Sequence, residues 1–257
     1  MSDELSISEN IYGHAKRLEW IKSRVGKTDR ILEVGCGTGY MICMPLLRAG
    51  YDVKGLDRDE KSIAYGREML HKEGLDAERI VPAGISDLDW PADVIIVSEV
   101  LEHIPTPDLA FFLGEIREKL NPGGKLFVTV PNGRGWFEME SFFWSKLGLG
   151  RLVELLRIPK VIIGLKKIFL GSGFIYPYLS FLDGSPHIQR FTFGSIQRLL
   201  NGNGWRVKEI TGSVLFAGPF SSLFFTGVKP VMKLNCLLGK WFPRIAAGFY
   251  LACERRD

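Results

Sequence analysis

The sequence predicts an α/β fold with a mostly parallel sheet covered by helices on both faces. Three observations predict it. Short apolar, β-branched runs alternate with stretches of helical spacing through the first half of the chain. One run, Ala92–Ser98, is continuously apolar and β-branched apart from Asp93, which is typical of a strand buried on both faces. With 257 residues, 46% of them hydrophobic, the chain suffices for one large domain or a domain with an insertion.

The first predicted elements are a helix, a strand and a second helix. Apolar residues recur at helical spacing across residues 11–25, which predicts an amphipathic helix. Residues 30–34 are a short apolar run that enters a glycine-rich turn, so we expect the first strand there. The next helix covers residues 40–49 and ends at Gly50.

The same alternation continues to the middle of the chain. A second strand is expected at residues 52–56, and a helix follows over 60–72 and stops near Gly74. Residues 79–82 form a short third strand, and residues 92–98 form the fourth. Because strands and helices alternate, the strands should be parallel with helical crossovers.

The remaining core elements are interrupted by long insertions. A helix is expected over residues 107–120, after which Asn121-Pro-Gly-Gly turns the chain into a fifth strand at 125–130. A sixth strand is expected at residues 207–211 and a last one at 248–253.

The glycine-rich turn after the first strand suggests a ligand site. Gly35, Gly37 and Gly39 come at every second residue, so the backbone can approach a ligand closely. A dinucleotide site would use G-x-G-x-x-G, and the Glu33 carboxylate just before this turn would repel a pyrophosphate. Asp57, at the tip of the second strand, is placed to hold two ribose hydroxyls. The pattern favours a nucleoside with an ammonium or sulfonium group; a glycine turn without a ligand is the alternative.

The E-x-G-x-G-x-G pattern, with Asp57 after it, resembles motifs I and II of the class I methyltransferases that bind S-adenosylmethionine. Ser-Glu-Val-Leu-Glu-His-Ile at residues 98–104 and Leu-Asn-Pro-Gly-Gly-Lys-Leu at 120–126 look like the small-molecule methyltransferases of quinone biosynthesis. The resemblance covers residues 28–133 and returns at 187–205. It implies a Rossmann-like, seven-stranded, mostly parallel sheet with an antiparallel last strand, here with helical apolar insertions.

The resemblance also implies the cofactor, S-adenosylmethionine, and its contacts. The glycine turn and the tip of the fourth strand would hold the methionine portion, Asp57 the ribose, and Arg58 and the loop after the third strand the adenine. Asp87 is the nearest candidate for the adenine amine. The implied cofactor contacts are Glu33, Gly35, Cys36, Gly37, Gly39, Asp57, Arg58, Ile85, Ser86, Ser98 and Glu99.

Two histidines are candidate bases for methylation of a hydroxyl. His103 follows the fourth strand, where open α/β sheets place their ligands, although it also fits a role in ordering its loop. His187 precedes the C-terminal helix and fits a loop or orienting role equally well. His14 and Arg17, on the first helix, are weaker candidates to face the site. An acidic hydroxyl needs no strong base, and the sequence shows no metal-ligand cluster.

The predicted domain organisation is a cofactor-binding core at residues 1–135, an apolar-basic insertion at 136–186, and the rest of the fold at 187–257 with a second apolar insertion near 214–245. The net charge of the chain is +4, but residues 141–182 alone carry +5 and residues 213–247 carry another +4, so the rest of the chain is negative. Three interpretations compete: a lid over the site, a surface that rests on anionic lipid, and a membrane span. The uncharged run 210–228 is nearly long enough to span but contains three glycines and a proline.

The expected function is O-methylation of a small apolar or lipid-like acceptor. Alternatives are a methyltransferase-like binding module without turnover, a nicotinamide-dependent oxidoreductase, and a protein or RNA methyltransferase. Nucleic acid is an unfavoured partner, because the basic residues of the insertions alternate with Leu, Ile and Phe. The polar N-terminus and four unpaired-looking cysteines favour a cytoplasmic protein, either soluble or peripheral at the membrane. The sequence sets no oligomeric state.

Overall fold

Seven strands form one sheet in the computed structural model, which describes residues 12–171 and 188–256. The strand order is β3-β2-β1-β4-β5-β7-β6, and only β7 runs antiparallel to its neighbours. This confirms the predicted fold. The strands are β1 (Arg30–Val34), β2 (Asp52–Asp57), β3 (Ile80–Pro82), β4 (Ala92–Ser98), β5 (Leu120–Pro131), β6 (Trp205–Gly212) and β7 (Gly248–Arg255).

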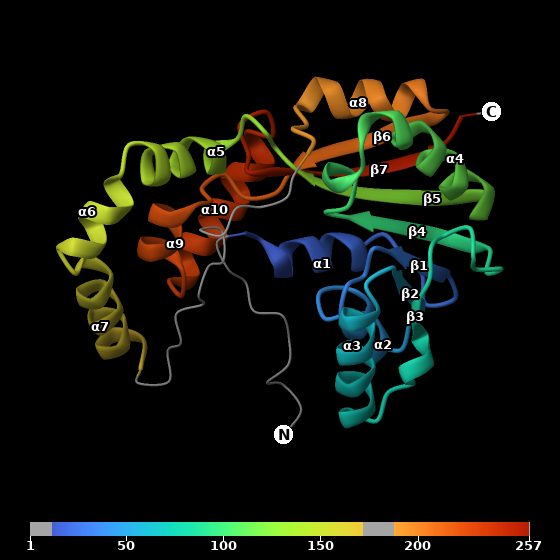
Figure 1. The fold of residues 1–257 in the computed structure, drawn as a ribbon, viewed down its shortest axis with the longest axis horizontal. Helices are drawn as coiled ribbons and strands as arrows, with labels where there is room; N and C mark the ends of the chain where they lie inside the picture. The colour runs from blue at the N-terminus through green and yellow to red at the C-terminus, as the bar shows by residue number, and fades with distance from the viewer. Residues whose placement is uncertain (1–11, 172–187, 257) are drawn as a thin grey trace.

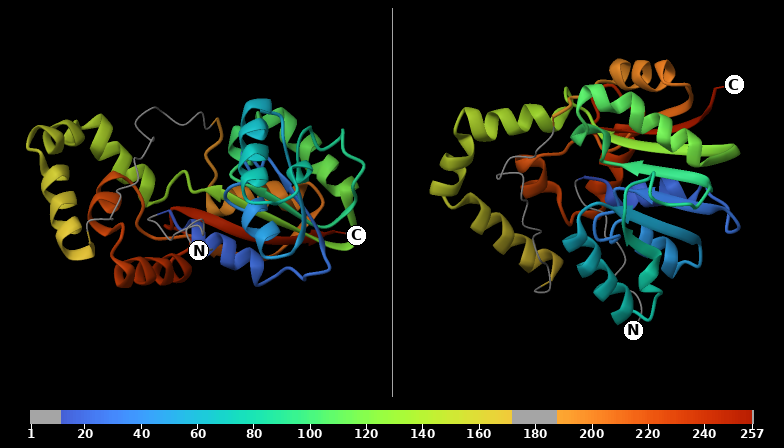
Figure 2. Two further views of the ribbon diagram at one scale, coloured as in Figure 1. Left: turned by 90° about the horizontal axis from the view of Figure 1, so that it is seen from below. Right: turned by 45° about the vertical axis from the view of Figure 1, so that its right-hand side comes forward.

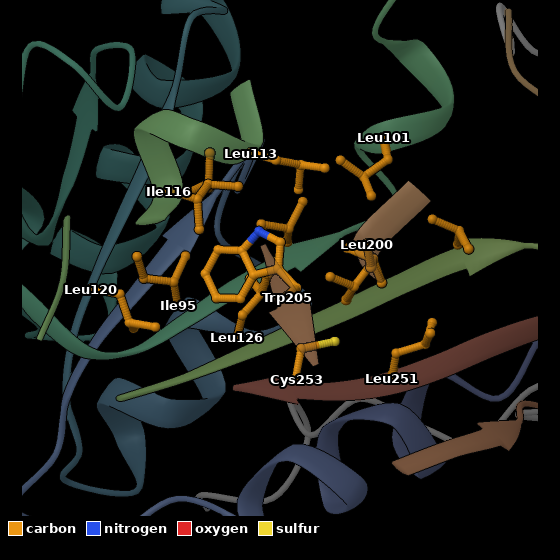
Figure 3. Close-up of a cluster of buried hydrophobic side chains, with 14 of the residues drawn as sticks. Ile95, Leu101, Leu113, Ile116, Leu120, Leu126, Leu200, Trp205, Leu251 and Cys253 are labelled. Atoms are coloured by element: carbon orange, nitrogen blue, oxygen red, sulfur yellow. The ribbon is translucent and has the colours of Figure 1, made fainter. Parts of the chain in front are cut away.

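Helices cover both faces of the sheet (Figure 1). One face carries α1 (His14–Lys22), α2 (Cys43–Arg48) and α3 (Glu60–Lys72), whose apolar residues join one buried cluster. The other face carries α4 (Leu109–Lys119) and α8 (Phe193–Gly202) over a second cluster. Trp205, fully buried, lies in the middle of this second cluster between α4, α8 and the sheet (Figure 3). The two apolar faces of the sheet therefore fix its position between the helix layers.

The fifth strand differs from the expectation. It begins at Leu120, so the predicted Asn121-Pro-Gly-Gly turn lies within the strand. Ala92 pairs with Leu120 and Val94 with Lys125, which places a register shift at this point. Gly123 has φ +76°, a conformation open to glycine, and the extra residues bulge out of the ladder there.

Several helices and strands begin later than predicted. The first helix begins at His14, after Gly13 in the left-handed region, and the second begins only at Cys43, because the glycine turn extends further. The short 3-10 helix Ala77–Arg79 takes the start of the predicted third strand. Two more 3-10 turns, Leu101–His103 and Thr106–Asp108, link β4 to α4.

The two insertions pack together into one helical lobe beyond the end of β5 at which α5 begins (Figure 1). Figure 2 shows from two further sides that the lobe projects away from the sheet. The helical path is interrupted before Pro159, which lies in the first turn of a new helix. The lobe consists of α5 (Trp136–Ser141), a π-helical turn (Phe142–Lys146), α6 (Leu149–Leu155), α7 (Ile158–Leu170), α9 (Pro219–Phe225) and α10 (Lys229–Trp241).

Buried polar contacts join the two halves of the lobe. The Glu140 carboxylate on α5 accepts hydrogen bonds from the backbone N–H and the hydroxyl of Ser221 on α9. Lys166 on α7 is 8% exposed, and its Nζ donates to the carbonyls of Leu223 and Thr226, each at 2.7 Å. Within the described residues, no helix has the length and apolar character needed to cross a bilayer.

Candidate active site

A cavity of about 570 Å³ lies at the carboxyl ends of the central strands. Its size falls within the range of ordinary small-molecule pockets. Open α/β sheets bind ligands at this edge, where the strand order reverses on either side of β1 and β4. It is lined by Val34, Gly35, Leu56, Asp57, Arg58, Ala83, Gly84, Ile85, Glu99, Val100, His103, Ile104, Pro105, Asp108, Phe111, Phe112 and Glu115.

The glycine turn reaches the lining of this cavity at its first glycine, Gly35. Gly35, Gly37 and Gly39 have φ between +54° and +74°, the left-handed region that favours glycine. A Cβ atom on Gly35 would lie 2.5 Å from a Val100 methyl carbon, whereas one on Gly37 would meet no atom within 4 Å. The turn thus leaves open space beside Gly37 that a ligand can occupy.

Asp57 is held in place by the same turn. One carboxylate oxygen accepts from the N–H of Gly37 at 2.8 Å, and the other accepts from the N–H of Asp59 at 2.9 Å. Each oxygen keeps a further lone pair, and Asp57 lines the cavity. This arrangement presents an oriented carboxylate, the group that holds two adjacent hydroxyls of a ribose.

Glu33 lies behind the turn and not in the cavity lining. Its side chain is buried, and Oε2 accepts a hydrogen bond of 2.8 Å from the N–H of Cys43 at the start of α2. Burial raises the pKa of Glu33 to about 8, against the opposing effects of the Cys43 hydrogen bond and the Arg17 charge. The carboxyl group therefore organises the turn and helix start, and a cation placed nearby would favour its ionised form.

The other predicted cofactor contacts divide into two groups. Arg58, Ile85 and Glu99 line the cavity together with Gly35 and Asp57. Five lie outside the lining: Gly37 and Gly39 further along the turn, Cys36, whose side chain packs behind the turn, Ser86, which is exposed and donates to Glu115, and Ser98, whose hydroxyl is 2.9 Å from that of Thr129. Burial raises the pKa of the Cys36 thiol well above its ordinary value, so it is no nucleophile.

The candidate bases are placed unequally. His103 is exposed, on the 3-10 turn after β4, and lines the larger cavity. His187 lies outside the described residues. Asp87 is exposed, and its carboxylate accepts from the N–H of Gly84 at 2.9 Å, so one of its oxygens serves the loop.

A second cavity, of about 220 Å³, adjoins the first at Glu99, which lines both. Glu99 has φ +56°, uncommon outside glycine, and its carboxylate accepts from the Thr129 hydroxyl and pairs with Arg17 at 3.5 Å. The second cavity is lined by Tyr12, His14, Arg17, Glu99, Pro131, Phe137, Glu138, Ser213, Ala217, Ala247, Gly248 and Tyr250. The sequence predicted Glu99 as a cofactor contact and gave His14 and Arg17 as weaker candidates to face the site; the other lining residues were not predicted.

Two titratable side chains with shifted pKa values lie near the residue that the two cavities share. Glu102 is fully buried, and burial together with the nearby Glu99 charge raises its pKa to about 9. His14 shows the opposite shift: burial and the Arg17 charge lower its pKa to about 4. At neutral pH both side chains are therefore uncharged, and Arg17 and Glu99 carry the local charges.

Comparison with known proteins decides the family. A family model described as a methyltransferase domain matches residues 15–210. The chain belongs to this methyltransferase family. The matched residues include the glycine turn, Asp57 and the β4 tip, so the family match and the cavity coincide.

Curated relatives of the chain include enzymes of quinone biosynthesis. A ubiquinone biosynthesis O-methyltransferase of Sinorhizobium medicae is 33% identical over 40% of this chain and 41% of its own length. The corresponding protein of Bordetella avium is 31% identical over 54% of this chain and 57% of its own length. The chain thus spans about half the length of the curated relatives it matches.

A solved structure extends the likeness of fold across nearly the whole chain. Magnesium protoporphyrin IX methyltransferase from Synechocystis, solved with bound SAH, has a TM-score of 0.54 and covers 95% of this chain and 81% of its own. The sequences are 16% identical, so this likeness concerns the fold alone.

Proposed function

We propose that this chain is an S-adenosylmethionine-dependent methyltransferase that methylates a hydroxyl oxygen of a small apolar or lipid-like acceptor. One observation carries the proposal: the larger cavity joins an open glycine turn to an oriented Asp57 carboxylate at the carboxyl ends of β1 and β2. The family match and the O-methyltransferase names of the curated relatives support it.

The chain's own residues fit this cofactor. The backbone beside Gly37 has room for the methionine portion, and Asp57 would accept hydrogen bonds from the ribose hydroxyls. Arg58 and Ile85 would border the adenine, and Glu99 would meet the methionine end. When bound, S-adenosylmethionine supplies a methyl group already activated by the positive charge on sulfur. The protein's contribution is then mainly alignment and exclusion of water.

Calorimetry and a labelled-methyl assay test the proposal together. We expect S-adenosylmethionine and its demethylated product to bind, with binding weakened by Asp57→Ala and unaffected by Asp89→Ala, a change at an exposed carboxylate outside the cavity lining. Tight NADH binding would favour an oxidoreductase instead. Cofactor binding without transfer to any cell-extract fraction would favour a binding module, and label in protein or RNA would favour those acceptors.

We propose further that the lobe rests on an anionic lipid surface of the cytoplasmic side, from which an apolar acceptor reaches the site. Side chains of α6, α7 and α10 support this. Leu155 is 79% exposed, Ile168 76%, Phe169 81% and Trp241 64%, and such large apolar groups gain free energy when they leave water.

Basic residues accompany these apolar side chains. Arg151, Arg157, Lys160 and Lys167 are exposed on α6, α7 and the turn between them, where each would gain roughly 1 kcal/mol near an anionic membrane. Exposed basic and apolar groups on the same helices suit an interfacial position. The alternative is that the lobe is a lid and that the same apolar surface closes over the site.

Sedimentation with vesicles tests the lipid proposal. The protein should bind vesicles of phosphatidylglycerol and phosphatidylcholine, less at high salt, and Phe169→Glu with Ile168→Glu should reduce binding at least ~10-fold. Tyr65→Glu, which changes a 59% exposed side chain on α3, is the matched control. Equal vesicle binding by all three proteins, or none by the parent protein, would leave the lid as the better interpretation.

A further inference from the structure

The second cavity has the position of an acceptor site. It shares Glu99 with the larger cavity, and helix α1, strand β7 and lobe helix α5 contribute to its walls. Tyr12, Phe137 and Tyr250 give it aromatic surface, and Tyr12 lies edge-on to Phe137 at 6.4 Å between ring centres. At about 220 Å³ it is smaller than ordinary ligand pockets, so it admits one ring or a short head group.

His14 presents a defined hydrogen-bonding group to this cavity. Its Nδ1 lies 3.2 Å from Nη2 of Arg17. A guanidinium group only donates hydrogen bonds, so Nδ1 must be the acceptor and carry no proton. In a neutral imidazole the proton then resides on Nε2. Arg17 is itself held by Glu99, at 3.5 Å from the other guanidinium nitrogen, Nη1, which keeps the guanidinium in place.

We propose that the methyl acceptor binds in the second cavity and that His14, fixed by Arg17 as the Nε2-protonated tautomer, donates a hydrogen bond to an oxygen of the acceptor. The inference rests on the proposed function, because it assigns the larger cavity to the cofactor. It makes His14 a donor and not a base: the nitrogen that would take a proton is already occupied by Arg17.

The charges around the cavity define the acceptor chemistry. His14 and Arg17 on α1 supply donors, while Glu99 at the end of β4 and Glu138 on α5 supply carboxylates. The Tyr250 hydroxyl donates to the carbonyl of Gly13 at 3.1 Å, which fixes β7 against the start of α1. An acceptor with a phenolic, carbonyl or carboxylate oxygen meets the His14 donor, and a vicinal hydroxyl can donate to Glu99 or Glu138. An acceptor without an oxygen lone pair leaves Nε2–H unmatched.

Nitrogen-15 NMR of the four histidines tests the tautomer directly. In protein saturated with S-adenosylhomocysteine, His14 should show a protonated Nε2 and an unprotonated Nδ1 from pH 5.5 to 8, since its pKa of about 4 lies below that range. Arg17→Met should mix the two tautomers, an effect that a merely structural role for Arg17 would not produce. A protonated Nδ1 in the parent protein, or tautomers unchanged by Arg17→Met, overturns the proposal.

Catechol, a ring with two adjacent hydroxyl oxygens, is the probe for the site. Its addition should shift the His14 Nε2 signal and leave that of His71, exposed on α3, in place. His14→Gln, which keeps an N–H donor but accepts no proton, should bind catechol within about threefold of the parent, and His14→Leu roughly 10-fold more weakly. Equal weakening in both variants, or shifts at His103 in the larger cavity alone, overturns the assignment.

Cofactor binding is measured on the same samples, so the two proposals fail separately. If S-adenosylhomocysteine does not bind by calorimetry, the proposed function fails. If it binds while catechol leaves His14 unchanged, the function stands and the acceptor site is wrong. His71→Gln is the matched control and should alter neither cofactor binding nor the His14 signals.

Discussion

Helices α3 and α7 are equally long but place their side chains in opposite ways. On α3, Ile63 and Leu70 are buried against the sheet, and the charged side chains of Glu68 and Lys72 face water. On α7, a lysine is buried while Ile168 and Phe169 are exposed. The contrast teaches that the core helix hides its apolar side chains from water, whereas the lobe helix leaves large apolar side chains exposed, as interaction surfaces do.

The largest expected effect comes from a substitution in the core, at the tightly packed glycine turn. Gly35→Ala places a Cβ atom 2.5 Å from Val100 at a residue with φ +74°. We expect S-adenosylhomocysteine binding to weaken on the order of 10²-fold, because the turn must shift to relieve the contact and the strained φ. Calorimetry measures it. Gly114→Ala on α4, where a Cβ atom meets nothing within 4 Å, is the control; similar losses in both would contradict the prediction.

A second effect follows from the buried carboxyl group behind the glycine turn. The pKa of Glu33 is raised from its ordinary 4.5 to about 8, so its favourable contribution to folding is complete below about pH 4.5 and is lost as the pH rises through 8. The parent protein should therefore lose on the order of a few kcal/mol of unfolding free energy, relative to Glu33→Gln, between pH 5 and 9.

Urea unfolding of both proteins at pH 5, 7 and 9 measures this difference. Glu118→Gln, at an exposed position of α4, serves as the control for a general effect of removing a carboxylate. A difference between parent and Glu33→Gln that stays constant with pH would show that Glu33 is ionised in the folded protein.

The smallest expected effect concerns Lys166, the lysine that is buried within the lobe. Lys166→Met leaves the carbonyls of Leu223 and Thr226 without their donor, which should cost about 1–3 kcal/mol within the lobe. Hydrogen exchange of α7 and α9 should speed up while α3 is unchanged. The neighbouring Lys167→Met, at an exposed position, should have no such effect. If α3 exchange rises equally, lobe and core unfold as one unit.

The sequence predicted the core well because each core element is specified locally. The strands Arg30–Val34 and Ala92–Ser98 and the helix Glu60–Lys72 have the predicted bounds, since apolar runs, glycines and the Asp59 N-cap mark them. The predicted start of β5, at residue 125, was wrong, because a bulge beside Gly123 keeps an apparent turn within the strand.

The candidate site was predictable only where it follows a strand. Asp57 is the last residue of β2, and Glu99 directly follows β4, so motif spacing could place both beside the glycine turn. The second cavity combines His14 with Phe137 and Tyr250, residues that only tertiary packing brings together. The burial of Lys166 was equally out of reach, since helical periodicity alone would place a lysine outward.

The hydrogen bonds that anchor α1 have a consequence for the order of synthesis. Lys16 Nζ donates to the carbonyl of Cys236 at 2.7 Å, and the carbonyl of Gly13 accepts from Tyr250, 237 positions later. A ribosome delivers these partners 220 and 237 residues apart. All residues that line the larger cavity lie between Val34 and Glu115, so a growing polypeptide can present them well before β7 emerges, whereas it gains the second cavity only after residue 250 has left the exit tunnel.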